Sequence, residues 1–248
     1  MANPNPGIAN LVSWWEFNES SGNAIDDVGT NTLTNNGTIA YTAGLRGNCA
    51  DLGTANTTKY FNKASVLGLS VNASRSYGTF IKIRTELSGA DQYLYPMHFN
   101  HSANGVQYYI QYQRESDTNK IAGGRGRTLV ADDGVKYNVN LGTTSWHLII
   151  VTWDGTTNIL YLDGASVNSG NPSTANGTAL GSDNFTVGRC ATASSGFMNM
   201  YADESFVFNT ALTADNVSWL WAAGMGRTYS DLLGISTPSV YLSDYGVM

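Results

Sequence analysis

The chain has 248 residues, of which 42% are hydrophobic and only 13% are charged, and its formal net charge is -6 at pH 7. An acidic chain without clustered Lys and Arg lacks the positive surface that binds phosphate backbones, so we expect no nucleic-acid partner. No segment approaches the roughly 20 apolar residues of a membrane helix, and the N-terminal stretch lacks the basic start and apolar core of a signal peptide. We therefore expect no membrane insertion, and synthesis in the cytoplasm without cleavage.

The length fits one large all-β domain, because abundant Gly, Asn, Ser and Thr favour turns over long helices. The first predicted strand covers residues 11–17 (LVSWWEF), and turns follow at 18–22 and 26–29. A further strand is predicted at 77–84 (YGTFIKIR), where apolar residues alternate with polar ones. The pattern favours a β-sandwich over a helical bundle.

The most aromatic part of the chain runs from residue 93 to residue 112 and leads into a predicted strand at 106–114 (VQYYIQYQR). Alternate residues of a strand point to opposite faces of the sheet, so one face is predicted to enter the core. That face carries Tyr108, Ile110 and Tyr112, and the other face carries Gln107, Tyr109, Gln111 and Gln113. The second face suits either solvent or a sugar lying across the sheet.

Residues 116–138 are rich in Gly and charge, with GGRGR at 123–127. The motif lacks the Gly-Lys-Ser/Thr ending of a phosphate-binding loop, so it does not indicate a nucleotide site. The composition predicts a hairpin tip.

A β-hairpin is predicted over residues 146–164 (WHLIIVTWDGTTNILYLDG), because β-branched and aromatic runs are separated by Asp-Gly turns. The last strands are predicted at 185–190 and 198–208. A short helix at about 214–223 follows, with Thr213 as N-cap and Gly224 at its end.

Three of these segments resemble the laminin-G-like, concanavalin-type jelly rolls. They are the opening WEFNESSG, the hairpin ending YLDG and the segment ADESFVFNTALTADNVSWLWAAG. The resemblance implies an all-β fold: a two-sheet antiparallel jelly-roll sandwich of the concanavalin A-like type, with one short C-terminal helix. It also implies an N-terminal arm at 1–10, a jelly-roll domain at 11–225 and a C-terminal tail at 226–248.

The same resemblance implies a structural calcium ion, because domains of this type often carry one. The residues that match its surroundings are Asp203 and Asp26. The alternative is that both carboxylates cap turns, since calcium needs six to eight oxygen ligands. His98 and His101 are expected to diverge on a strand, so they do not predict a zinc site.

Catalysis by a glycoside hydrolase requires two carboxylates about 5 to 9.5 Å apart across the scissile bond. The sequence shows no such pair on one strand face: Glu16 and Glu19 straddle a strand end, and Asp203 and Glu204 are adjacent and should point oppositely, as a solvated or metal-holding pair. No Gly-x-Ser-x-Gly nucleophile motif accompanies the histidines either. We therefore expect that the protein is not an enzyme.

The predicted function is surface recognition. Sugars pair an apolar ring face with an aromatic side chain and their hydroxyls with amides, so Tyr109, Gln107 and Gln111 are the predicted glycan-binding residues. The alternative for this face is a solvated sheet surface without ligand. By analogy with jelly rolls of phage heads and tails, we expect a structural or decoration protein on the surface of a virus particle. A free-standing extracellular carbohydrate-binding or adhesion module and, further off, a glycoside hydrolase are the other candidates.

The ends of the chain have no core pattern of their own. Ordering them costs backbone entropy of roughly 1 to 2 kcal/mol per residue, so they should contact another chain of the capsid or tail, or pack back on their own domain. Cys49 and Cys190 lie in apolar runs, and the sequence leaves open whether they form a disulfide or two buried thiols.

Overall fold

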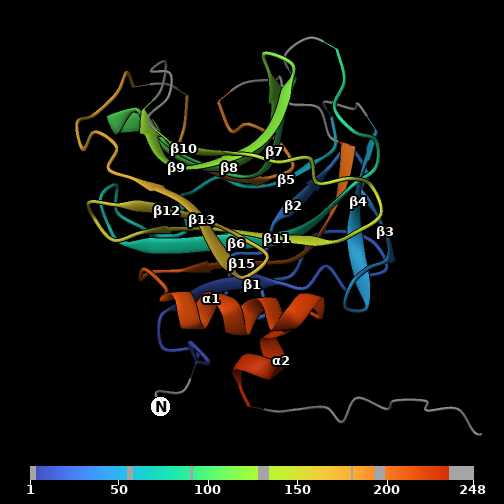
Figure 1. Ribbon diagram of the computed structural model, residues 1–248. Helices are drawn as coiled ribbons and strands as arrows, with labels where there is room; N and C mark the ends of the chain where they lie inside the picture. Colours follow the sequence, from blue (N-terminus) through green and yellow to red (C-terminus); the bar gives the residue numbers. More distant parts are fainter. Residues whose placement is uncertain are drawn as a thin grey trace, which may run out of the picture.

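The computed structural model describes residues 4–54, 58–89, 92–127, 134–179, 181–192 and 199–234. These residues form two antiparallel sheets of eight and seven strands that pack face to face (Figure 1). Hydrogen bonds order the first sheet as β13-β12-β11-β6-β15-β4-β3, with β1 also on β15, and the second as β10-β9-β8-β7-β14-β5-β2. The predicted all-β antiparallel sandwich is confirmed.

The eight strands of the first sheet are β1 (Leu11–Trp15), β3 (Ala40–Ala43), β4 (Asn48–Thr54), β6 (Arg75–Ile83), β11 (His147–Trp153), β12 (Asn158–Leu162), β13 (Ala165–Gly170) and β15 (Asn199–Phe208). The seven strands of the second are β2 (Thr34–Asn36), β5 (Tyr60–Lys63), β7 (Gln92–His101), β8 (Val106–Glu115), β9 (Thr118–Arg127), β10 (Val135–Asn138) and β14 (Asn184–Val187). The predicted hairpin is the antiparallel pair β11 and β12.

The main core lies between the sheets and is rich in aromatic rings. Trp15 stacks on Phe185 with ring centroids 5.2 Å apart, and Tyr77 meets Phe99 edge-on at 5.4 Å. The predicted inward face of β8 is confirmed, because Tyr108, Ile110 and Tyr112 are all fully buried in this core. Trp153 of the hairpin is buried there as well.

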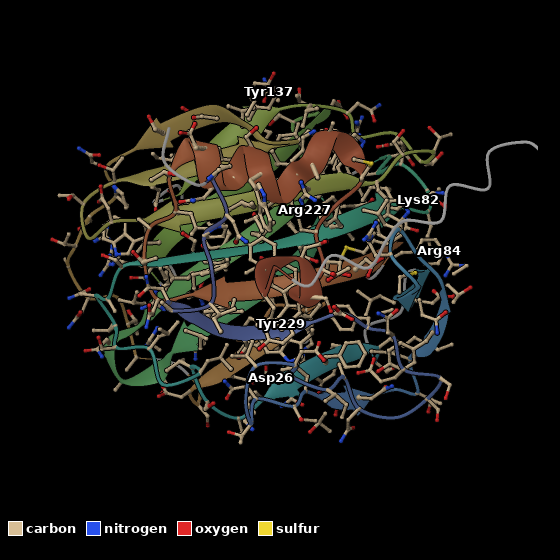
Figure 2. All side chains as sticks on the ribbon, turned by 90° about the horizontal axis from the view of Figure 1, so that it is seen from below. Asp26, Lys82, Arg84, Tyr137, Arg227 and Tyr229 are labelled. Atoms are coloured by element: carbon tan, nitrogen blue, oxygen red, sulfur yellow. The ribbon has the colours of Figure 1, made fainter. Side chains whose placement is uncertain are left out.

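A second apolar cluster covers the outer face of the eight-stranded sheet. The predicted helix is present as α1 (Ala214–Trp221), and its N-cap Thr213 forms a capping box with Asn216. A 3-10 turn (Ala222–Gly224) and a short helix that we did not predict, α2 (Tyr229–Leu232), follow. Figure 2, viewed from this side, shows both helices lying over the sheet. The cluster that they form with the sheet includes Trp14, Phe80, Ile150, Phe206, Val217, Leu220 and Leu232, with Trp146 partly buried against it.

The prediction of a hairpin tip at 116–138 is wrong for residues 118–127, which form the ten-residue strand β9. Glycine disfavours strands, but here the two sheets come too close for side chains. A Cβ on Gly123 would lie 2.5 Å from Val151 Cγ2 and 2.8 Å from the carbonyl oxygen of Tyr109. Arg125, in the same motif, is fully buried and donates to the carbonyls of Thr174 and Ala175 at 3.0 and 3.1 Å.

The described parts of both chain ends pack back on the domain. The amide of Asn5 donates to the carbonyls of Asp231 and Leu232 at 3.5 and 3.3 Å, and Asn216 Nδ2 donates to the carbonyl of Pro4 at 2.9 Å. Leu232 is buried in the second cluster, so the packed body extends past the predicted boundary at residue 225. No described helix combines the length and the apolar character needed to cross a bilayer.

Candidate functional site

The outer face of the seven-stranded sheet is the surface on which the predicted ligand residues lie. Neither α1 nor α2 covers it, because both lie beneath the other sheet (Figure 1). Strands β7 and β8 run through its middle, and their register sets His98 opposite Tyr109 and Asn100 opposite Gln107. The rings of His98 and Tyr109 stack with centroids 6.5 Å apart and planes 22° from parallel. We call this surface, centred on His98 and Tyr109, the open face.

The predicted residues Gln107, Tyr109 and Gln111 share one side of β8, but they are less free than a solvated sheet face would be. Gln107 is half-buried and its Nε2 donates to Thr192 Oγ1 at 3.2 Å. Tyr109 is half-buried, and its hydroxyl lies against the backbone of Gly134. Gln111 is only 8% exposed. The strand therefore presents the edge of the Tyr109 ring and the amide of Gln107, which Thr192 holds in place, whereas the amide of Gln111 is buried.

Sequence reasoning missed Cys190 and the segment 188–192 that carries it across the open face. Cys190 Sγ lies 3.8 Å from His98 Nε2 and 3.3 Å from Thr192 Oγ1, and the Ala191 N–H donates to His98 Nδ1 at 3.2 Å. Nδ1 is occupied by that N–H, so Nε2 is the ring nitrogen that faces the sulfur. The pair comes from residues 92 positions apart, which no local pattern links.

These contacts set the chemistry of the thiol. Burial alone would raise the pKa of Cys190, but the His98 ring and the hydrogen bonds of Thr192 outweigh it and lower the pKa to about 6. Cys49, on β4 of the other sheet, shows the opposite behaviour, because burial and then the charge of Asp203 raise its pKa to about 12. Both cysteines are free thiols, which settles the question of a disulfide.

Asp26, the first predicted calcium residue, lies in the turn behind β1 and is 5% exposed. Its carboxylate accepts four hydrogen bonds, from the Trp14, Val28 and Asn31 backbone N–H groups and the Ser13 hydroxyl, at 3.1, 3.2, 2.9 and 3.3 Å. A carboxylate has about four lone-pair sites, so these donors fill it. The arrangement matches the alternative stated above, in which the carboxylate caps a turn.

Asp203, the second predicted calcium residue, accepts three hydrogen bonds from backbone N–H groups. Its two oxygens accept the N–H groups of Leu45, Arg46 and Glu204 at 2.8, 3.1 and 2.9 Å. Across the described ranges no group of three or more His, Cys, Asp or Glu side chains is placed to hold a metal ion. The two aspartates therefore do not fit a calcium shell, and the calcium ion stays a prediction.

The sequence led us to expect that Asp203 and Glu204 form a solvated or metal-holding pair, but the pair is not solvated. Both residues are fully buried, because β15 carries an irregularity between Asp203 and Phe206 and Glu204 adopts a left-handed φ of 45°. Burial raises the pKa of Asp203 to about 7 against its hydrogen bonds, and burial together with the charge of Asp203 raises the pKa of Glu204 well above its ordinary value. Glu204 Oε2 accepts from Trp14 Nε1 at 2.5 Å, while Oε1 is buried and has no partner among the described residues.

Comparison with known proteins places the fold. A family model described as the concanavalin A-like lectin/glucanases superfamily matches residues 54–218. No curated protein sequence is similar to the chain. Among solved structures, Domain 4 of AbnA, a GH43 extracellular arabinanase from Geobacillus stearothermophilus, in complex with arabinotriose, matches with a TM-score of 0.60 and 19% identity over 88% of this chain and 98% of that one.

Two toxin domains match with similar scores. The binding domain of Paraclostridial Mosquitocidal Protein 1 has a TM-score of 0.61 and 14% identity over 86% of this chain and 52% of that one. The binding domain of Botulinum Neurotoxin DC in complex with SialylT has a TM-score of 0.63 and 11% identity over 89% and 52%. This chain therefore spans about half the length of these toxin domains, and identities so low show likeness of fold alone. With the family model covering two thirds of its sequence, the chain belongs to the concanavalin A-like lectin/glucanase superfamily.

Proposed function

We propose that the chain is a non-catalytic recognition module that binds a glycan on its open face. The observation that carries the proposal is the asymmetry of the two outer sheet faces: helices cover one, while the other presents the half-buried ring of Tyr109 beside the amide of Gln107. The superfamily and the arabinotriose and SialylT complexes of the similar structures support a carbohydrate as the ligand.

The chemistry of the open face suits a sugar. The edge of the half-buried Tyr109 ring offers apolar contact to C–H groups, and Gln107 and Thr192 offer amide and hydroxyl groups to sugar hydroxyls, while the His98 ring, only 1% exposed, supports Tyr109 from below. One such site with millimolar affinity corresponds to about -4 kcal/mol, so firm attachment to a surface would require several copies.

Titration with arabinotriose and a panel of other oligosaccharides tests this proposal. Tyr109→Ala should lower affinity at least tenfold, because an aromatic contact is worth about 0.5 to 1.5 kcal/mol beyond its buried area. Tyr137→Ala is the control, since Tyr137 is 39% exposed on β10 of the same sheet and away from β7 and β8. Equal binding by both variants and the unchanged protein would exclude Tyr109 from the site, and release of reducing ends during incubation would refute the non-catalytic assignment.

A more specific form of the proposal places the module on the surface of a virus particle, as a decoration protein bound to capsid or tail chains. Its support is the analogy with phage jelly rolls, together with a C-terminal tail that lacks a core pattern. The predicted anchor, Thr237 to Met248, lies outside the described residues. Deleting it should release the protein from particles in a sedimentation assay and leave the melting temperature unchanged. A truncated protein that still sediments with particles would refute the anchoring role of Thr237 to Met248, and an intact protein that does not sediment with them would favour the free-standing extracellular module.

A further inference from the structure

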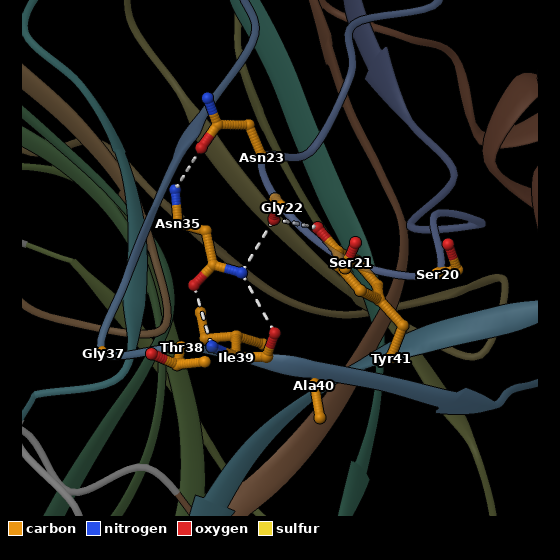
Figure 3. Close-up of a pocket in the computed structure, with 10 residues that line it drawn as sticks. All are labelled: Ser20, Ser21, Gly22, Asn23, Asn35, Gly37, Thr38, Ile39, Ala40 and Tyr41. Carbon is orange, nitrogen blue, oxygen red and sulfur yellow. Dashed lines mark hydrogen bonds between the residues drawn. The ribbon is translucent and has the colours of Figure 1, made fainter.

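A pocket of about 520 Å³ lies between the edge strands of the two sheets, β2 and β3, and the turn at residues 20–23 (Figure 3). It is lined by Ser20, Ser21, Gly22, Asn23, Asn35, Gly37, Thr38, Ile39, Ala40 and Tyr41. Its volume falls in the range of about 300 to 1,000 Å³ that small-molecule sites occupy. Strands β7, β14 and β5 separate β8 from β2, so this pocket is distinct from the open face.

The pocket is held in shape by one side chain, Asn35. Its Oδ1 accepts from the Ile39 N–H at 2.8 Å, and its Nδ2 donates to the carbonyls of Gly22 and Ile39 at 2.8 and 3.0 Å. Its own N–H donates to Asn23 Oδ1 at 3.0 Å, and Figure 3 shows these bonds joining opposite sides of the pocket. The walls are thus fixed before any ligand arrives, which lowers the entropic cost of binding.

The wall at residues 37 and 38 has an unusual backbone. Gly37 and Thr38 both have left-handed φ values, of 78° and 56°, and a Cβ on Gly37 would collide with the carbonyl of Thr58. A β-branched residue such as threonine rarely adopts this conformation, and residues held in it concentrate at binding sites. Here the hydrogen bond from the Ile39 N–H to Asn35 holds the neighbouring backbone in the left-handed conformation, and the Thr38 side chain is exposed at the pocket wall.

The lining is polar but carries no charge. Tyr41 contributes the one aromatic ring, which packs against Phe61 at 6.2 Å and whose hydroxyl donates to the Gly22 carbonyl at 3.0 Å. In the described part of the chain, the hydroxyls of Ser20, Ser21 and Thr38 have no hydrogen-bond partner, so they can serve a ligand. Burial, and then the charge of nearby Glu19, raises the pKa of Tyr41, so the surroundings favour neutral ligands over anions.

We propose that this pocket binds an uncharged sugar residue, and that it is a second carbohydrate site separate from the open face. A fixed aromatic ring beside several free hydroxyls complements a ring that has an apolar face and hydroxyl edges. The absence of charge among the ten lining residues selects against sialylated or sulfated sugars, which would need a cation. The inference rests on the proposed function, because it assumes that the chain recognises glycans.

Filling the pocket tests the inference. Ser21→Trp places a large ring in the pocket from an exposed turn, and Ser166→Trp, at an exposed position on β13 at the far end of the sheet, is the matched control. Both are titrated with neutral and with sialylated oligosaccharides. Because the open face stays intact, we expect Ser21→Trp to lose one of two sites, so that its stoichiometry for neutral oligosaccharides falls to about half that of the unchanged protein, whereas Ser166→Trp keeps both sites. Ala40→Trp, from a second exposed lining position, should repeat the loss, and thermal melts confirm that each variant is folded.

The outcomes separate this inference from the proposed function. If Ser21→Trp and Ala40→Trp bind neutral sugars normally while Tyr109→Ala does not, the open face is the glycan site and the pocket proposal fails. If the two pocket variants lose only sialylated ligands, the assignment to uncharged sugars fails. If the unchanged protein binds no member of either panel, the proposed function itself is wrong, and the pocket proposal fails with it.

Discussion

The two outer faces of the sandwich differ in what covers them. On the eight-stranded sheet, α1 and α2 add a second apolar cluster, in which Trp14 stacks on Phe206 with centroids 4.9 Å apart. On the seven-stranded sheet, the middle strands carry imidazole, phenol and amide groups, crossed by the segment 188–192. The same β-scaffold thus carries an apolar cluster under helices on one face and polar and aromatic groups on the other, and changes to the two faces should have different consequences.

The largest expected effect is on the stability of the covered face. Leu220→Ala in α1 should lower the free energy of unfolding by about 2 to 5 kcal/mol, because Leu220 is buried against the sheet and truncation leaves a cavity. Gln107→Ala on the open face should cost about 1 kcal/mol or less, the value of one hydrogen bond. Urea unfolding measures both free energies, and equal losses of stability in the two variants would refute the difference between the helix-covered face and the open face.

The next effect is a pH dependence that arises beneath the helices. A carboxyl whose folded pKa is raised stabilises the fold below its unfolded pKa, near 4, and this contribution is lost as the pH rises through the folded value, about 7 for Asp203. The free energy of unfolding should therefore fall between pH 5 and pH 8. Glu204→Gln keeps a carbonyl oxygen for Trp14 and removes one of these charges, so it should recover about 1 kcal/mol or more at pH 8.

Glu115, on the open-face sheet, supplies the matched control for this pH dependence. Hydrogen bonds from Lys120 and Lys136 lower the pKa of Glu115, so its contribution is present above its ordinary pKa and is lost only as the pH falls below it. Glu115→Gln should leave the slope between pH 5 and pH 8 unchanged. A wild-type stability that is flat or rising over that range would contradict the account of Asp203 and Glu204.

The two thiols should differ in reactivity. At pH 7 a thiol with a pKa near 6 is mostly thiolate, whereas one with a pKa near 12 is almost entirely protonated. Iodoacetamide, followed by peptide mass spectrometry, should modify Cys190 at least tenfold faster than Cys49. His98→Ala should reduce that difference by removing the hydrogen bond to Sγ. Faster labelling of Cys49 would show that access rather than thiolate content controls the reaction.

The smallest expected effect concerns calcium. The family resemblance implies that chelator should lower the melting temperature, but N–H and O–H donors occupy Asp26, and backbone N–H groups occupy Asp203. We therefore expect the melting temperature to be the same in EDTA and in added calcium. A rise of several degrees in calcium would establish an ion that stabilises the folded state by mass action.

The elements that the sequence predicted well are those fixed by local patterns. Alternation identified the buried side of β8, two Asp-Gly turns bounded the β11–β12 hairpin, and a threonine cap located α1. The strand β9 was missed because glycine carries no side chain with which to signal burial. Its strand conformation depends on the close approach of Val151 from the other sheet.

The site residues were harder to predict, because their environment depends on distant parts of the chain. Alternation places Gln111 with Tyr109, but it cannot show that Gln111 is almost fully covered. Cys190 meets His98 only through the pairing of β14 with β7. Asp203 and Glu204 should have pointed to opposite faces, and a bulge with a left-handed φ at Glu204 buries both. Irregular backbone of this kind has no signature in residue type.

The contacts of the N-terminal arm also determine how the molecule would stand on a support. Asn5 bonds to α2 and Pro4 to α1, so the described ends of the chain both leave from the helix-covered side. A tag or linker joined to either end would therefore attach the protein by that side. The outer side of the seven-stranded sheet, which carries the half-buried ring of Tyr109, would then face away from the support (Figure 1). Immobilisation through a terminus should consequently preserve ligand access, whereas coupling through Lys120 or Lys136, which flank the open face on β9 and β10, should obstruct it.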